Sequence, residues 1–124
     1  MVRGLTFQSD ILEVAMQASV LRNDVILNNI ANADTPGFKR SAVFFEEAFQ
    51  NALQRFDRTG RLDLSRAAPQ TRVVDRGFSQ RMDGNNVNME LEMVDLFQNA
   101  MRYDLMANSV INNYRRIGLV TKSR

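Results

Sequence analysis

Two apolar stripes at heptad spacing, one near each end of the 124-residue chain, constrain its fold more than any other feature. Residues that recur at alternating steps of four and three lie on one face of an α-helix, so each stripe predicts a long amphipathic helix. The first stripe lies within residues 7–25 and the second within residues 93–117. Their members are Phe7, Ile11, Val14, Ala18, Leu21 and Val25, and then Met93, Leu96, Ala100, Tyr103, Ala107, Val110, Tyr114 and Ile117.

Each predicted helix has to bury its stripe. A lone helix is marginal in water, because most helical stability comes from burial of the apolar face. Each buried Leu, Ile or Val side chain contributes about 1.5–3 kcal/mol. We therefore expect the first helix to pack on the last within one chain, antiparallel or crossed, with neighbouring copies covering what stays exposed. A closed three-helix bundle, with both stripes internal, satisfies the same pattern equally well.

Local signals set the limits of the two helices. Ser9 or Asp10 is suited to cap the start of the first helix. The Thr-Pro-Gly run at 35–37 ends it, since Pro followed by Gly fits the central positions of a type II turn. Asn88 is suited to cap the last helix, which is expected to reach residue 118 or so and to be roughly 45 Å long.

The middle of the chain is less regular. Residues 42–56 predict a short second helix with an aromatic face. Residues 57–86 lack helical periodicity, so we expect an extended, partly disordered loop with room for one small hairpin between brief strands at 72–74 and 77–80. The side chains that form the aromatic face of the short helix are Phe45, Phe49 and Phe56, with Ala48, Ala52 and Leu53 beside them.

The sequence thus predicts a mainly α protein with four segments in one structural unit. A core helix (1–33) is followed by a turn and short helix (34–56), then by a basic irregular segment (57–86), and finally by a second core helix (87–124). The two core helices are expected to pair as a coiled-coil-like core.

Charge is concentrated in the middle of the chain. The whole chain carries a net charge of +2. Residues 51–81 contain seven arginines and three aspartates, a net charge of +4. This segment is either a solvated linker or an arginine-rich contact surface for an acidic partner. A helical nucleic-acid-binding protein is a rival interpretation, but no recognition motif accompanies the arginines.

The residue types present argue against an enzyme. The chain has no cysteine and no histidine, which removes thiolate nucleophiles, the usual zinc ligands and the commonest general base. The carboxylates are scattered and no glycine-rich phosphate loop is present, so we expect no catalytic residue, cofactor or metal. No apolar run is long enough to span a membrane, and the N-terminus lacks the pattern of a cleavable signal peptide.

Two motifs resemble those of a known family. Residues 28–39, Asn-Asn-Ile-Ala-Asn-Ala-Asp-Thr-Pro-Gly-Phe-Lys, resemble the N-terminal signature of the flagellar rod, hook and hook-filament-junction family, with Leu27 in place of the common leading Ala. Residues 82–93, Met-Asp-Gly-Asn-Asn-Val-Asn-Met-Glu-Leu-Glu-Met, resemble a segment found in one rod component of that family, with Asn88 in place of the usual aspartate. The motif residues of the first signature are Asn28, Asn29, Asn32, Thr35, Pro36, Gly37 and Phe38.

The resemblance implies a structural subunit of the proximal rod, which crosses the periplasm and forms part of the export channel wall. Its implied partners are copies of itself, other rod proteins, the basal-body base proteins and the type III export apparatus. No nucleic acid and no direct membrane insertion are implied, and export proceeds without a cleaved signal peptide. The alternative is another axial component of the same family. A monomer is expected to be partly disordered and to order on assembly.

The resemblance also suggests roles for single residues. Phe45 and Phe49 match a short aromatic element that early rod and hook subunits present to the export gate, although one helix face packing on a core explains the same spacing. Asn28, Asn29 and Asn32 are expected to hydrogen-bond across subunits or to the following turn. The alternative is that their amides satisfy the last carbonyls of a frayed helix end.

Overall fold

The computed structural model describes residues 2–74 and 81–123. It contains three helices, α1 (Val2–Ala31), α2 (Glu46–Thr59) and α3 (Met89–Lys122), and a one-turn 3₁₀ helix, η1 (Ser65–Ala67). Two short strands, β1 (Ser41–Phe44) and β2 (Gln70–Val73), pair antiparallel. The mainly helical prediction is confirmed. The strand predicted at 77–80 lies outside the described residues.

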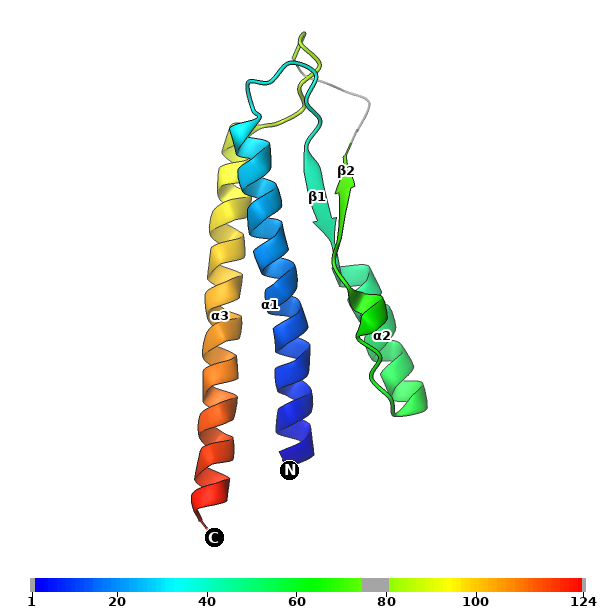
Figure 1. Ribbon diagram of the computed structural model, residues 1–124, viewed down its shortest axis with the longest axis vertical. Helices are drawn as coiled ribbons and strands as arrows, with labels where there is room; N and C mark the ends of the chain where they lie inside the picture. Colours follow the sequence, from blue (N-terminus) through cyan, green and yellow to red (C-terminus); the bar gives the residue numbers. More distant parts are fainter. Residues whose placement is uncertain (1, 75–80, 124) are drawn as a thin grey trace.

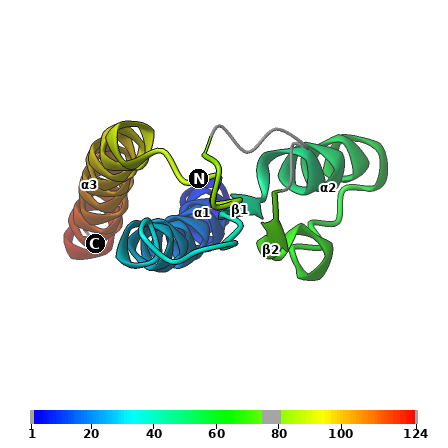
Figure 2. The same cartoon turned by 90° about the horizontal axis from the view of Figure 1, so that it is seen from above.

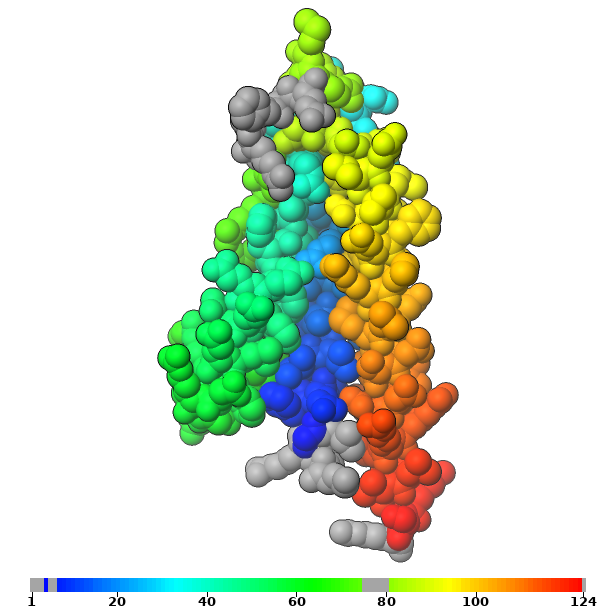
Figure 3. Space-filling view, turned by 180° about the vertical axis from the view of Figure 1, so that it is seen from behind, coloured from blue at the N-terminus to red at the C-terminus, as the bar shows by residue number. Residues whose placement is uncertain are grey.

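Helix α1 is the central element. It lies antiparallel beside α3, so that both chain termini are at the same end of the pair (Figure 1). The β1–β2 ribbon and α2 lie on the other side of α1, as the view from above shows (Figure 2). At 1.5 Å per residue, α3 with its 34 residues is roughly 51 Å long. The space-filling view shows α1 lying between the α2 side and α3 (Figure 3).

The start of α1 differs from the prediction. The helix begins at Val2, so Ser9 and Asp10 lie inside it and neither is its N-cap. Phe7 gives the physical reason, since its ring stacks on Phe56 of α2 with centroids 4.6 Å apart. That contact stabilises helical structure ahead of the predicted cap.

The predicted turn after α1 is confirmed. Gly37 has a φ of 72°, and the Phe38 N–H donates to the Thr35 carbonyl at 3.2 Å. A positive φ at the third residue of a four-residue turn, with this hydrogen bond, is type II geometry. Glycine adopts that φ without steric penalty.

The prediction that the short helix begins at residue 42 is wrong. Residues 41–44 form β1, and the helix follows at Glu46. Val43 and Phe44 favour strand conformation, and β1 pairs with β2 in the register Ser41–Val73 to Phe44–Gln70. The predicted strand near 72–74 therefore exists, but its partner lies before α2 and not in a local hairpin.

Helix α2 buries the predicted aromatic face. It ends at Gly60, which has a φ of 65° and donates its N–H to the Phe56 carbonyl at 2.7 Å. The Phe45 and Phe49 rings stack with centroids 5.0 Å apart. The small apolar core lies between α1, α2 and η1 and consists of Ala18, Phe45, Ala52 and Ala67, with Val14, Ala15 and Phe49 packed against it.

The start of α3 agrees with the prediction. The Asn88 side chain accepts a hydrogen bond from the Leu91 N–H at 3.2 Å, which caps the helix. Glu90 and Glu92 lie in the first turn, where the helix dipole favours anions. The helix continues to Lys122, four residues beyond the predicted end.

Candidate functional site

The largest fully buried side chains in the described residues are polar ones: Glu92, Asn29 and Asn85. They gather where α1 ends and α3 begins, next to the segments that carry the two sequence motifs. We call Asn29, Arg40, Asn85, Asn86 and Glu92 the polar junction. Since a buried polar group is costly unless it is hydrogen-bonded, the partners of each show what this part of the chain holds together.

Asn29 joins α1 to β1 and to α3. Its side-chain amide accepts from the Ser41 N–H at 2.9 Å and donates to the Ser41 carbonyl at 2.8 Å. The same Nδ2 donates to Glu92 Oε2 at 3.1 Å. An amide that pairs with both backbone groups of one residue acts as a strand neighbour would. This contact fixes Ser41 in an extended conformation.

Glu92 closes the junction with an ion pair. Arg40 Nε donates to Glu92 Oε1 at 2.6 Å, and the Glu92 side chain is 1% exposed. A carboxylate this buried is tolerated because a cation and an amide both donate to it. Three elements that are far apart in the sequence, α1, β1 and α3, are thereby tied together.

Asn85 caps the end of α1 from the second motif. Its Nδ2 lies 2.9, 3.0 and 2.9 Å from the carbonyl oxygens of Asn32, Ala33 and Thr35. Its Oδ1 accepts from the Val87 N–H at 2.8 Å. The last carbonyls of a helix have no partner within it, and here a residue more than fifty positions away supplies one.

Asn86 extends the same contact to the strand. Its Oδ1 accepts from the Arg40 N–H at 2.6 Å, and its Nδ2 donates to the Val74 carbonyl at 2.7 Å. The Gly37 N–H also donates to the Asp83 carbonyl at 2.8 Å. The two motifs, separated by some fifty residues, thus form one structure.

The predicted asparagines have different surroundings. Asn29 is fully buried in the junction. Asn32 donates to the Asn28 carbonyl at 2.8 Å and accepts from the Thr35 hydroxyl at 3.2 Å, so it serves both the helix end and the following turn. Asn28 and Pro36 are exposed. Sequence reasoning missed Arg40, Asn85, Asn86 and Glu92 as site residues, although three of them lie within the second motif.

The first predicted stripe is shared between α2 and α3. Phe7, Val14 and Ala18 contact the α2 side, in the ring stack and core described above. Ile11 and Leu21 line hollows shared with α3, and Val25 lines one shared with β1 and α3. The surface of α1 toward α3 also includes Ser19, whose carbonyl accepts from Asn99 Nδ2 at 2.8 Å. The expected pairing of α1 with α3 exists, and the aromatic face of α2 covers part of the apolar stripe.

The second predicted stripe is divided between two environments. Leu96, Ala107, Val110 and Ile117 are half-buried, whereas Met93, Ala100 and Tyr114 are exposed. The residues of α3 that are buried outright are Glu92, Asn99 and Asn113, at seven- and fourteen-residue spacing. The inner surface of α3 is therefore rotated from the prediction by less than one residue, and its most buried positions are polar, with half-buried apolar side chains beside them.

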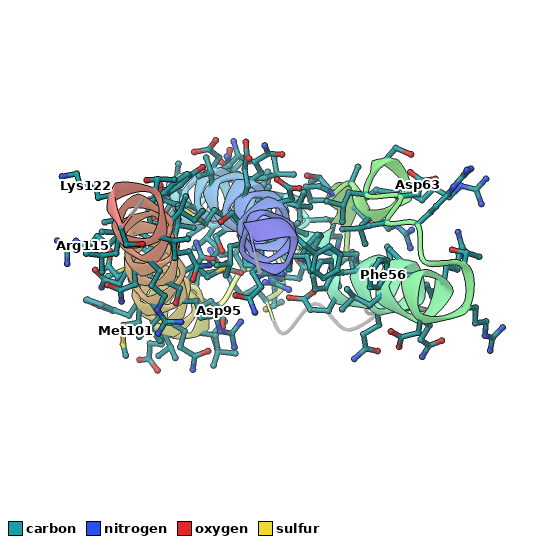
Figure 4. The ribbon with its side chains drawn as sticks, turned by 90° about the horizontal axis from the view of Figure 1, so that it is seen from below. Phe56, Asp63, Asp95, Met101, Arg115 and Lys122 are labelled. Carbon is teal, nitrogen blue, oxygen red and sulfur yellow. The ribbon has the colours of Figure 1, made fainter. Side chains whose placement is uncertain are left out.

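Another surface of α3 is apolar and exposed. Val94, Phe97, Met101 and Leu105 recur at steps of three and four, so they form one stripe, which we call the outer face of α3. Their exposed fractions are 50%, 65%, 63% and 69%. Met101 lies on the side of α3 away from α1, whereas Phe56 lies near α1 (Figure 4).

One ion pair joins α1 to α2. Arg22 Nη2 lies 2.6 Å from Glu46 Oε1. Partial burial opposes ionisation of Glu46, but hydrogen bonds from the backbone and from Arg22, together with the charge of Arg22, outweigh it. The pKa of Glu46 therefore lies below its ordinary value of 4.5.

Among residues 2–74 and 81–123, no group of three or more acidic side chains is placed to hold a metal ion. Within the same residues, no helix is both long enough and apolar enough to cross a membrane.

Comparison with known proteins defines the class. Residues 10–39 match the family model described as "Flagella basal body rod protein". The chain is 35% identical over 117 residues to the flagellar basal body rod protein FlgB of Borrelia hermsii, covering 82% of this chain and 86% of that one. It is 29% identical over 114 residues to FlgB of Bacillus subtilis (88% of each chain) and 25% identical over 120 residues to FlgB of Escherichia coli (86% and 84%).

The chain has a long helix pair with an exposed apolar face, and the family model covers part of its polar junction. Together these features define a structural component of the flagellar basal body rod. Within that class, the chain belongs to the FlgB family. The predicted family is confirmed, and the family is one of structural rod proteins and not of enzymes.

Proposed function

We propose that this chain is a subunit of the proximal rod, and that it assembles with copies of itself and with other rod and base proteins through its two terminal helices. The outer face of α3 carries the proposal. Four bulky apolar side chains on one helix face, each at least half exposed, are what a helix presents when a neighbouring subunit covers it. In the rod, such helices side by side would form the channel wall and transmit torque.

The polar junction supports this role by fixing the subunit's shape. It holds the end of α1, the strand β1 and the start of α3 in one arrangement, through contacts that leave the outer face of α3 uncovered. A rod subunit needs a rigid point from which its long helices project at a set angle. Buried, hydrogen-bonded polar groups supply such specificity better than apolar contacts do.

Substitution in the outer face tests the proposal. Phe97→Asp or Met101→Asp places a charge on the surface that a neighbour would bury, so we expect rod assembly and motility to be lost while secretion and helicity persist. Ser109→Asp is the control, because Ser109 is an exposed polar residue of the same helix that lines a hollow shared with α1. Normal swimming of both outer-face variants would contradict the proposal.

We further propose that Phe45 and Phe49 are read by the type III export apparatus before the chain folds. In the folded chain Phe45 is only 7% exposed and stacks on Phe49, so the element is available only in an unfolded chain. Phe45→Ala is expected to reduce secretion. Phe56→Ala, which removes a ring of the same helix outside the export pattern, is expected to leave secretion unchanged. If both variants are secreted equally, Phe45 and Phe49 act only in core packing.

A further inference from the structure

A groove of about 630 Å³ lies between α1 and α3, and its lining has a particular chemistry. From α1 it receives the carboxylates of Glu13 and Asp24 and the half-exposed side chain of Val20. From α3 it receives the rings of Tyr103 and Tyr114. Among the described side chains that line the groove, none is an arginine or a lysine. Glu13 and Asp24 form no ion pair with any residue in the described ranges.

Carboxylates beside tyrosine rings suit one kind of side chain. A guanidinium group pairs with carboxylates through a planar fork of donors and also stacks on aromatic faces. Its aliphatic stem covers apolar surface at the same time. A groove with acidic and aromatic walls is therefore complementary to a segment that presents exposed arginines.

The chain itself carries such a segment. Residues 55–72, which we call the arginine arm, contain five arginines against two aspartates, a net charge of +3. All five arginines are exposed. Arg66 approaches Asp63 at 3.7 Å, and the charge of Arg55 helps, as a minor cause, to lower the pKa of Asp63. Arg58 and Arg61 form no ion pair within the described part of the chain.

We propose that the arginine arm of one copy docks in the groove of a second copy, with Arg58 and Arg61 facing Glu13 and Asp24. This inference rests on the proposed rod function and deepens it by naming the two surfaces that meet. The arm cannot reach the groove of its own chain. It is held against α1 by the Phe7–Phe56 stack, whereas α1 and α3 alone line the groove, and α2 lies across α1 from α3 (Figure 2).

The geometry of such a contact fits a rod. The two surfaces differ, so the interface is heterologous, and after docking one copy keeps a free groove and the other keeps a free arm. Heterologous contacts that do not close into a ring generate helical polymers. The arm would thereby serve as the lateral link between subunits, while the outer face of α3 remains available for other neighbours.

Charge reversal in the full-length chain tests the docking. Glu13→Arg with Asp24→Arg makes the groove basic, and Arg58→Glu with Arg61→Glu makes the arm acidic. Each double variant alone is expected to self-associate about tenfold more weakly than the unaltered chain, measured by sedimentation velocity at low salt. Arg115→Glu with Arg116→Glu is the matched control for the arm variant, because it changes the net charge by the same amount while neither side chain is among those that line the groove, and it is expected to leave association unchanged.

Mixing the two variants gives the decisive result. The reversed groove of one variant accepts the reversed arm of the other, and the two unaltered surfaces also match, so an equimolar mixture is expected to recover association. Recovery supports contact between copies. A mixture as weak as either variant alone, an equal loss in the control, or an unaltered chain that stays monomeric at every concentration tested would overturn the docking.

Cross-linking locates the contact independently. The chain has no cysteine, so Gln17→Cys in the groove and Gln54→Cys beside the arm can be placed on separate copies. Oxidation of the mixture is expected to give mixed dimers, whereas Gln17→Cys with Gln98→Cys gives none. If the Phe97→Asp variant loses rod assembly but the arm variants do not, the docking fails and the rod function stands. If none of them loses it, the rod function itself is contradicted.

Discussion

The two sides of α1 are built from different chemistry. Toward α2, α1 presents Val14, Ala15 and Ala18 to phenylalanine rings, and the contact is an ordinary apolar core. Toward α3, the buried side chains include Ser19, Asn99 and Asn113, and Oδ1 of Asn99 has no hydrogen-bond partner within the described residues. The α2 side is therefore held by an apolar core, whereas the contact between α1 and α3 contains buried polar side chains and leaves the outer face of α3 exposed.

The largest expected effect lies at the polar junction. Glu92→Ala leaves Arg40 and the Asn29 amide without their buried acceptor, and removal of one partner from a buried ion pair costs about 3–5 kcal/mol. Since the apolar core is small, we expect the start of α3 to detach, seen as a fall in unfolding free energy by denaturant titration. Glu90→Ala, in the same helical turn but exposed, serves as control and should change stability by less than about 0.5 kcal/mol. If the two variants are equally stable, the polar junction does not hold the start of α3 in place.

A smaller loss is expected at the cap of α1. Asn85→Ala removes a donor that three carbonyls of the turn share, and it also removes the acceptor of the buried Val87 N–H. Each carbonyl keeps a second donor, from Thr35, Arg81 or Phe38, but a buried N–H left without a partner costs about 1–3 kcal/mol. Hydrogen exchange of amides in residues 29–38 should rise along with the loss of stability. Asn28→Ala is the matched control, because Asn28 is exposed and its side chain forms none of these contacts. Unchanged exchange in the Asn85 variant would show that the turn holds its shape alone.

The contact between α1 and α3 can be made more apolar by a substitution at Asn99 of α3. Asn99→Leu replaces a buried amide whose oxygen is unpaired, so we expect stability to rise by about 1 kcal/mol. Thermal unfolding of the variant would measure the gain. A loss of stability would mean that the hydrogen bond from Asn99 to Ser19 contributes more than the replaced amide costs.

The smallest effect concerns the Arg22–Glu46 pair. The folded-state pKa of Glu46 is depressed, so the pair stabilises the fold above the ordinary pKa of 4.5, and this contribution disappears as the pH falls through the lower folded-state value. Because Glu46 is mostly exposed, the contribution at neutral pH should be below about 1 kcal/mol. Unfolding of Glu46→Gln and the unaltered chain should differ at pH 7 and converge at acid pH, below the folded-state pKa of Glu46. A difference that persists at acid pH would trace to packing and not to charge.

Local patterns were sufficient for several features. Heptad spacing predicted both long helices, Pro36-Gly37 predicted the type II turn, and Asn88 predicted the cap of α3. These succeed because each depends on residues within one or two turns of each other. The start of α1 and the strand β1 were missed because their causes, Phe56 and the pair of Asn29 and β2, lie far along the chain.

The sequence by itself determined that the chain has two long amphipathic helices, no cysteine or histidine, and the motifs of a flagellar rod family, since periodicity and residue type are local properties. Only the tertiary structure decided how the stripe of α1 is shared between α2 and α3, which face of α3 is left uncovered, and that Asn29, Arg40 and Glu92 meet. Those outcomes depend on which of several apolar surfaces buries the most area, and on hydrogen bonds between residues up to 80 positions apart, which no local pattern encodes.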